Sequence, residues 1–63
     1  MTTHQFWLIV DEEDYAEFDS KLRSRKIFPR AAHEIKKGMI IVYFECTIEQ
    51  WDKILAEWGN KYA

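Results

Sequence analysis

The stretch that decides the fold is residues 37–50, which read KGMIIVYFECTIEQ. Residues 39–46 are mostly β-branched, aromatic and apolar, and this composition favours a strand. The Lys37-Gly38 pair before them predicts a tight turn. Residues 47–50 match the capping-box pattern of a threonine followed three positions later by glutamine, which predicts the first turn of a helix. We therefore expect a turn, a strand and a helix in direct succession.

The residues before this stretch predict a strand, a helix and a second strand. His4–Val10 is rich in aromatic and branched side chains and favours a first strand. Asp11 and the three carboxylates that follow it predict a helix start, because negative charge is favoured at the positive end of the helix dipole. Pro29 prevents that helix from continuing, and Ala31–Lys36 favours a second strand. The apolar stripe of the first helix is predicted at Tyr15, Phe18 and Leu22.

The expected order of elements is therefore β-α-β-β-α, with a last helix starting after Thr47. Its apolar stripe is predicted at Ile48, Trp51, Ile54, Leu55, Trp58 and Tyr62. We predict an α+β fold made of one two-layer domain over residues 1–63. It is a split βαβ, ferredoxin-like arrangement lacking the last strand, with two helices on one face of a three-stranded sheet. Strands 4–10 and 39–46 are expected to lie side by side and parallel, with strand 31–36 at the edge.

Composition limits how this fold is held together. The chain has 63 residues, 48% of them hydrophobic and 16% aromatic, and one cysteine, so no disulfide forms within it. His4, His33 and Cys46 have no zinc-ligand spacing, and we expect neither a metal nor a cofactor. The apolar runs are far shorter than the roughly 20 residues that cross a bilayer, and no secretory signal is visible. These features favour a cytoplasmic protein without a membrane partner, held by dense packing or self-association.

Charge is unevenly distributed along the chain. The net charge is −2, residues 1–20 carry six acidic groups and no Lys or Arg, and residues 21–37 carry a net charge of +6. This pattern excludes a uniformly basic nucleic-acid binder, and the helix dipole explains much of it. It leaves one candidate patch for nucleic acid or an acidic partner, formed by Arg23, Arg25, Lys26, Arg30, Lys36 and Lys37.

The alternation of side chains along the first and third strands predicts an apolar open face. Gln5 and Glu45 mark the side that points away from the helices, and Phe6 and Phe44 mark the other side. An open sheet face normally alternates to polar residues, whereas this one does not. The face is predicted to carry Trp7, Ile9, Met39, Ile41 and Tyr43. A patch of this kind is typical of an interface, so we assign these five residues as the candidate partner-binding site.

Two segments resemble the RNA recognition motif family. Residues 37–44, with their basic residue, glycine and closing Phe44, are similar to that family's third-strand signature. Residues 6–9 are similar to its first-strand signature, with Trp7 at the position that stacks on a base. The resemblance implies binding of RNA or single-stranded DNA. Met39 and Ile41 stand where the family has base-stacking aromatics, and its fourth strand has no counterpart in the chain.

No arrangement of residues predicts catalysis, so we expect a protein without enzymatic activity. The acidic residues 11–14 are explained by the helix start, and a His33–Cys46 nucleophile pair would need an exposed, activated thiolate. We favour a protein-interaction module, a regulator or inhibitor of a larger protein or enzyme, analogous to small phage-type inhibitors. A homodimer or weak self-association through the open face is expected. The alternatives are a nucleic-acid binder using Trp7, Tyr43 and the basic segment 21–37, and, last, a small enzyme.

Overall fold

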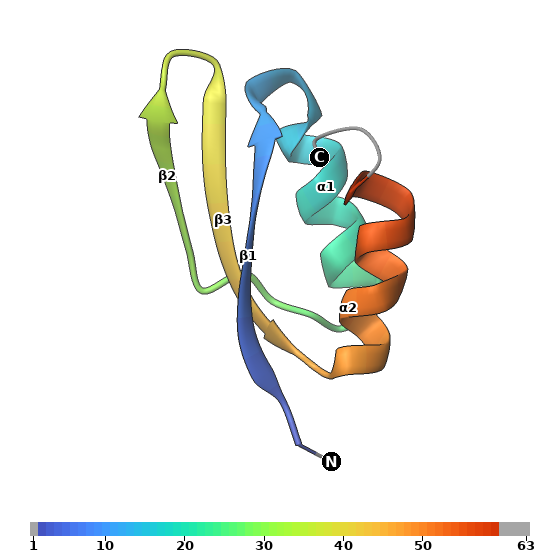
Figure 1. Cartoon of the computed structure of the whole chain (residues 1–63). Coiled ribbons are helices and arrows are strands. Elements are labelled where there is room, and N and C mark those ends of the chain that lie inside the picture. The colour runs from blue at the N-terminus through green and yellow to red at the C-terminus, as the bar shows by residue number, and fades with distance from the viewer. Residues whose placement is uncertain (1, 60–63) are drawn as a thin grey trace.

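A three-stranded sheet with two helices on one side forms the described part of the protein (Figure 1). The computed structural model describes residues 2–59. The elements in chain order are β1 (His4–Asp11), α1 (Glu12–Ser24), β2 (Ala31–Lys36), β3 (Met39–Cys46), α2 (Ile48–Ile54) and the π-helical turn η1 (Leu55–Gly59), which continues α2. The predicted α+β class, the β-α-β-β-α order and the helices on one face are confirmed.

The direction of the strands differs from the prediction. The sheet order is β1-β3-β2, and both β1 and β2 pair with β3 in antiparallel fashion. The first and third strands are neighbours as expected, but the prediction that they run parallel is wrong. The crossover through α1 returns the chain to the start of β2, so β2 is the strand parallel to β1. The tight β2–β3 turn then reverses the chain, and β3 enters between them in the opposite direction.

Local interactions explain where the helices begin. Thr47 and Gln50 form the predicted capping box: the Gln50 backbone N–H donates to Thr47 Oγ1 at 3.2 Å, and the Thr47 N–H donates to Gln50 Oε1 at 3.0 Å. Asp11 is the N-cap residue of α1, although its side chain makes no capping hydrogen bond. At the same corner the Glu12 N–H donates to the Gly38 carbonyl oxygen at 2.9 Å. Gly38 has φ +83°, which glycine adopts without steric cost.

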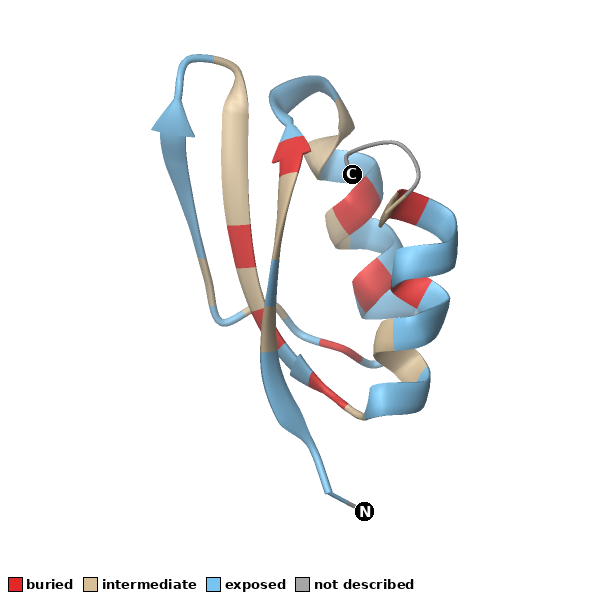
Figure 2. Ribbon diagram, viewed as in Figure 1, coloured by how far each residue is buried: buried red, intermediate tan, exposed pale blue. Residues whose placement is uncertain are grey.

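The core lies between the helices and the sheet (Figure 2). The prediction of which alternate residues of β1 and β3 point toward the helices is confirmed, because those residues are buried or packed against the core. The buried residues are Val10, Phe18, Leu22, Ile27, Val42, Phe44, Cys46, Ile54 and Trp58. A chain of ring contacts crosses this core from β1 to η1. Its successive members are Phe6 and Trp51 (stacked, centroids 4.5 Å apart), Phe44 (5.8 Å from Trp51), Phe18 (6.0 Å from Phe44) and Trp58 (5.2 Å from Phe18).

The apolar stripe of the last helix is narrower than predicted. Ile54 and Trp58 are buried and Trp51 is partly buried. Ile48 and Leu55 remain exposed, at 55% and 38%, so their assignment to the buried stripe is wrong. They lie to one side of the line that faces the sheet, and nothing in the described part of the chain covers that side. The predicted contribution of residue 62 lies outside the described residues.

The end of α1 adds a core residue that the sequence analysis did not identify. The Lys26 N–H donates to the Arg23 carbonyl oxygen, and the Ile27 N–H donates to the Leu22 carbonyl oxygen, at 3.0 and 2.9 Å. These two bonds form a Schellman motif, in which Lys26 occupies the left-handed position with φ 61°. Ile27 therefore turns back onto the core beside Leu22, and both side chains are buried.

Removing a ring from the centre of the core is expected to cost far more than removing one from the surface. Phe44 is fully buried, whereas Phe28 is 60% exposed. We expect Phe44→Ala to lower the free energy of unfolding by about 3–5 kcal/mol and Phe28→Ala to change it by less than about 0.5 kcal/mol. Chemical denaturation followed by circular dichroism measures both. Equal denaturation midpoints for the two variants would contradict the assigned core.

The left-handed residue at the end of α1 gives a second prediction. A non-glycine side chain in this conformation costs about 1–2 kcal/mol, so Lys26→Gly is expected to raise the free energy of unfolding by about 0.5–1 kcal/mol after the flexibility of glycine is counted. The control is Ala16→Gly at an exposed position within α1, which should lower it by about 1 kcal/mol. Thermal unfolding of both variants tests the pair. If Lys26→Gly destabilises as much as Ala16→Gly, residue 26 is not left-handed.

Candidate functional site

Cross-strand partners on the open face of the sheet line up in rows. Residues directly opposite each other on paired strands point to the same face, so the register defines these rows. One row holds Trp7 of β1, Tyr43 of β3 and Ala31 of β2. The next holds Ile9, Ile41 and His33. In the third row Met39 lies between Asp11 and Lys36, so charged residues border the apolar rows at this end.

The structure places all five predicted partner-binding residues on this face. Trp7 is 55% exposed, and Ile9, Met39, Ile41 and Tyr43 are half-buried by their neighbours. Both helices pack on the other side of the sheet, as Figure 1 shows. Within residues 2–59 no other element covers these side chains, and their role in binding a partner stays a prediction.

Polar and charged residues border the opposite end of the face. Glu45, the cross-strand partner of Gln5, accepts a hydrogen bond from Thr3 Oγ1 at 2.9 Å and lies 3.7 Å from Arg30 Nη2. The Arg30 backbone N–H also donates to the Tyr43 carbonyl oxygen at 2.8 Å. The face therefore has an apolar centre between two charged borders, which is the usual anatomy of a protein interface.

A bulge in β2 selects the residues that this strand contributes to the face. Lys36 pairs with Met39 next to the turn, but beyond it Glu34 pairs with Ile40, so the register shifts by one residue. A shift of one residue moves every later side chain to the other face of the sheet. The bulge thus brings His33 to the open face and sends Glu34 to the helix side. The sequence analysis missed Ala31 and His33. Only the bulge places them on the open face, and no sequence motif predicts it.

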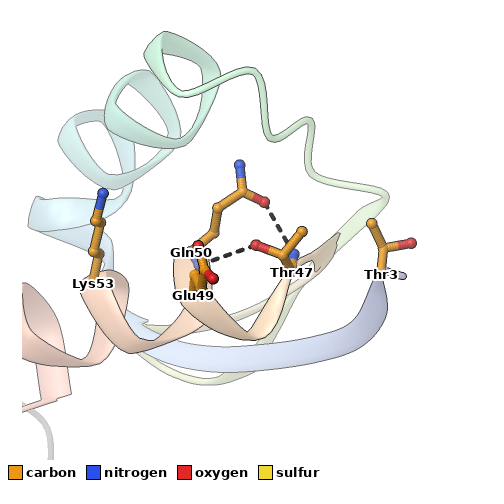
Figure 3. A pocket seen from close by; sticks show the side chains of 5 residues that line it. All are labelled: Thr3, Thr47, Glu49, Gln50 and Lys53. Atoms are coloured by element: carbon orange, nitrogen blue, oxygen red, sulfur yellow. Dashed lines mark hydrogen bonds between the residues drawn. The ribbon is translucent and has the colours of Figure 1, made fainter. Parts of the chain in front are cut away.

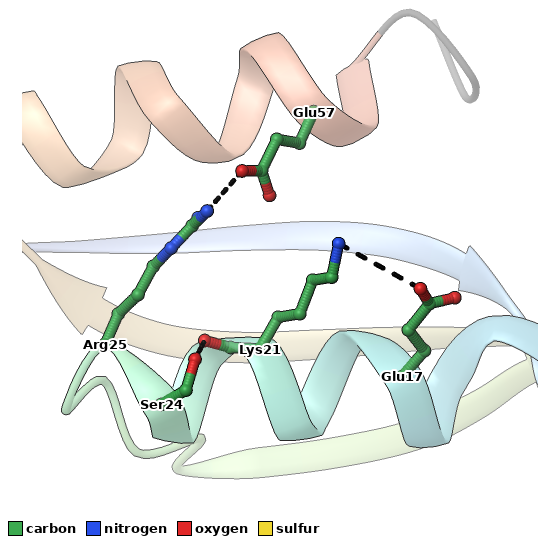
Figure 4. Close-up of polar contacts among 5 residues, drawn as sticks. All are labelled: Glu17, Lys21, Ser24, Arg25 and Glu57. Carbon is green, nitrogen blue, oxygen red and sulfur yellow. Dashed lines mark hydrogen bonds and ion pairs between the residues drawn. The ribbon is translucent and has the colours of Figure 1, made fainter.

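The six residues of the candidate basic patch do not gather on one surface. Arg23, Arg25 and Lys26 lie at the end of α1 in the helix layer, whereas Arg30, Lys36 and Lys37 lie in or beside β2. Two of those in the helix layer are paired with carboxylates. Arg23 Nε lies 2.9 Å from Asp19 Oδ2, and Arg25 bonds to Glu57 of η1 (Figure 4).

The neighbouring lysine of α1 also has partners within the helix layer. Lys21 Nζ lies 3.9 Å from Glu17 Oε1 and 5.9 Å from the ring centroid of Trp58. Figure 4 shows Lys21, Arg25 and their carboxylate partners on the two helices rather than on the open face of the sheet. Much of the positive charge of segment 21–37 therefore serves contacts within and between the helices.

The structure does not bring His33 and Cys46 together as a reactive pair. Cys46 is buried on the helix side of β3, and its burial raises the pKa of its thiol, which disfavours the reactive thiolate. His33 lies opposite Ile41, on the open side of the sheet. The two side chains thus point to opposite faces. In the region covered by residues 2–59, no three His, Cys, Asp or Glu side chains group closely enough to hold a metal ion.

A shallow hollow of about 290 Å³ lies beside the start of α2 (Figure 3). Its lining residues are Thr3, Thr47, Glu49, Gln50 and Lys53. Figure 3 shows that the Thr47 and Gln50 side chains are used in the capping box, and the Thr3 hydroxyl donates to Glu45, so three of the five polar side chains of this hollow already have partners within the protein. None of the helices between residues 2 and 59 is long and apolar enough to cross a membrane.

The two segments that resemble the RNA recognition motif family are neighbours in the sheet. Residues 6–9 belong to β1 and residues 37–44 to the turn and β3, and Trp7 lies directly opposite Tyr43. Met39 and Ile41, the other β3 residues at the centre of this face, are aliphatic, and Glu45 lies at its rim. Comparisons of the whole chain with models of protein families, with curated proteins and with solved structures find no match.

Proposed function

We propose that this protein is a non-catalytic interaction module that binds another protein through the open face of its sheet. One observation carries the proposal: the rows Trp7–Tyr43 and Ile9–Ile41 lie next to each other, and residue Trp7 is 55% exposed to water. A sheet face of this composition normally packs against something. Its centre is also depleted of charge, as the centres of protein interfaces are.

The composition of the face favours a protein partner over a small ligand. The face is a surface of three paired strands rather than an enclosed cavity, and aliphatic side chains make up most of its centre. Tryptophan and tyrosine at the centre of an interface tend to dominate the binding energy, which makes Trp7 and Tyr43 the expected hot spot. The borders formed by Asp11 and Lys36 at one end and Glu45 and Arg30 at the other would set orientation.

A module of this kind acts by covering a surface of its partner. We therefore propose a regulator or inhibitor of a larger protein, by analogy with small inhibitors of phage type. In the absence of that partner the same face would bind a second copy. Two copies would meet around a two-fold axis, so that like residues lie near one another.

A charge at the centre of the face tests this proposal. Ile41→Glu is expected to abolish self-association and partner binding, because a buried, unpaired carboxylate is costly only where the face is covered. Its helical circular dichroism should stay close to that of the unchanged protein. The matched control is Ala32→Glu, which adds the same charge to the helix side of exposed β2 and should leave association unchanged.

Light scattering, and affinity capture from the source cell followed by mass spectrometry, provide the readouts. We expect Ile41→Glu to lose binding of a specific protein, or dimer formation, and Ala32→Glu to keep it. Unfolding of monomeric Ile41→Glu would show that Ile41 belongs to the core and that the helix-covered and open faces of the sheet are assigned the wrong way round. A folded Ile41→Glu that keeps every partner would show that the face is not an interface.

Binding of single-stranded nucleic acid is the second candidate function. It is favoured by the exposed Trp7 ring directly opposite Tyr43, since bases stack on such rings with about 1–3 kcal/mol each. The separation of the aromatic face from the ion-paired Arg23 and Arg25 favours the protein partner instead.

Salt dependence separates the two candidates. We expect a uridine decamer to bind weakly and to lose affinity steeply between 50 and 200 mM salt, because few cations border the open face. Trp7→Ala should change this binding little. Fluorescence anisotropy measures both. Submicromolar, sequence-dependent binding at physiological salt, lost with Trp7→Ala, would reverse the order of the two candidates.

A further inference from the structure

The two edges of the sheet differ in how they are protected against pairing with another strand. The β2 edge follows Pro29, carries Glu34 and Lys36, and contains the bulge, and such features discourage strand addition. The β1 edge has no proline and no bulge, and its one charged residue, Asp11, lies at its end. Its eight residues read HQFWLIVD, contain neither proline nor lysine, and pair with β3 in one unbroken register. Within residues 2–59 no strand lies along the outer side of β1.

An apolar flank of α2 and η1, formed by Ile48 and Leu55, faces the same side as this edge. Glu57 of η1 bonds to Arg25, the C-cap residue of α1, and thereby marks the side of the second helix that faces the first. Ile48 and Leu55 lie about half a turn around the helix from Glu57, at about 100° per residue, so they point away from α1. Trp51 meanwhile stacks on Phe6 of β1. Figure 1 draws β1 in front of β3 and α2 in front of α1, so this flank and the free edge face the same way.

The contacts between the two layers show where α2 lies above the sheet. On the helix side of β2, Ala32 and Glu34 are exposed, so the helices cover only β1 and β3. Two adjacent strands are about 10 Å wide, whereas two packed helices are about 20 Å wide. Trp51 stacks on Phe6 of β1, whereas Phe18 of α1 contacts Phe44 of β3, so α2 lies on the β1 side of the helix layer. Phe6 and Leu8, which point toward the helices from β1, are only half-buried, so part of their side chains is left uncovered.

We infer that the outer edge of β1 and the flank formed by Ile48 of α2 and Leu55 of η1 form an acceptor slot for one extended segment of a partner protein. The segment would add a fourth strand next to β1 through backbone hydrogen bonds and place alternate apolar side chains under the helix. A second copy that pairs antiparallel through its own β1 does not fit here. Each α2 packs over its own β1, so paired β1 strands about 5 Å apart would bring two α2 helices together on one side of the sheet, whereas helix axes approach no closer than about 8 Å.

The charge beside the slot defines the partner segment further. Asp52 lies on the same flank of α2, between Ile48 and Leu55, and is exposed. It makes no ion pair within the described part of the chain, and no Lys or Arg occurs in β1. A segment that alternates apolar and polar residues and carries lysine or arginine therefore complements this slot.

This inference rests on the proposed protein-binding function but uses a second surface. The open face would hold the folded body of a partner, and the β1 edge would hold an extended part of it. The two surfaces adjoin along β1, because Trp7 belongs to the open face while Phe6 and Leu8 point under the helix.

A designed peptide tests the slot directly. The probe is an octapeptide with a lysine at each end and alternating valine and threonine between them. Its control has proline in place of a central valine, which removes a donor and disfavours the extended pairing. Nuclear magnetic resonance of the labelled protein should show the probe, and not the control, binding with a dissociation constant below about 1 mM. Alternate amides of β1 should become protected from hydrogen exchange.

Matched variants locate the site. Ile48→Ser should weaken probe binding about five- to tenfold through lost apolar contact, whereas Ile35→Ser should not, although Ile35 on the other edge is 51% exposed. Asp52→Asn should weaken binding at low salt only. Ile41→Glu should leave probe binding unchanged, which separates this slot from the open face.

Three results would overturn the inference. The first is no binding of the probe at 1 mM. The second is binding that is insensitive to Ile48→Ser but lost with Ile41→Glu, which would assign the peptide to the open face. The third is concentration-dependent protection of the β1 amides in the protein alone, which would make the occupant a second copy.

Discussion

The chain of ring contacts from Phe6 to Trp58 is the interaction on which the rest of this structure depends. It joins β1, α2, β3, α1 and η1 in turn, and each aromatic pair adds about 0.5–1.5 kcal/mol beyond the burial of its area. A domain of this size buries only about 60% of its unfolded surface, and its one cysteine can form no internal disulfide. Dense aromatic packing therefore stabilises the core without an internal disulfide.

The position of this cluster determines which surfaces are left uncovered. Since Trp51 stacks on Phe6 and Phe18 contacts Phe44, the helices are held over β1 and β3 and away from β2. The other side of the sheet stays open with its apolar rows. The same placement leaves Ile48 and Leu55 exposed beside β1. Both proposed binding surfaces thus follow from one packing arrangement.

Charged side chains are distributed differently in the helix layer and on the open face of the sheet. Arg23 and Arg25 are paired with carboxylates of the helix layer, where the pairs join residues four apart in α1 or link α1 to η1. Such exposed pairs contribute little to stability individually. Their carboxylates nevertheless neutralise arginine side chains that could otherwise bind the phosphates of a nucleic acid. The open face keeps charge only at its borders, and this favours a protein partner whose apolar surface meets the centre.

The sequence by itself determined what depends on local chemistry. The strands 31–36 and 39–46, the turn at Gly38, the capping box at Thr47 and the parity of β1 and β3 all follow from propensity, capping and alternation between near neighbours. Only the tertiary structure decided the antiparallel direction of β1 and β3, the burial of Ile27, the exposure of Ile48 and Leu55, and the bulge that turns His33 to the open face. These features depend on where segments distant in sequence meet, and a one-residue shift of register or an uncovered helix flank leaves no periodic signal in the chain.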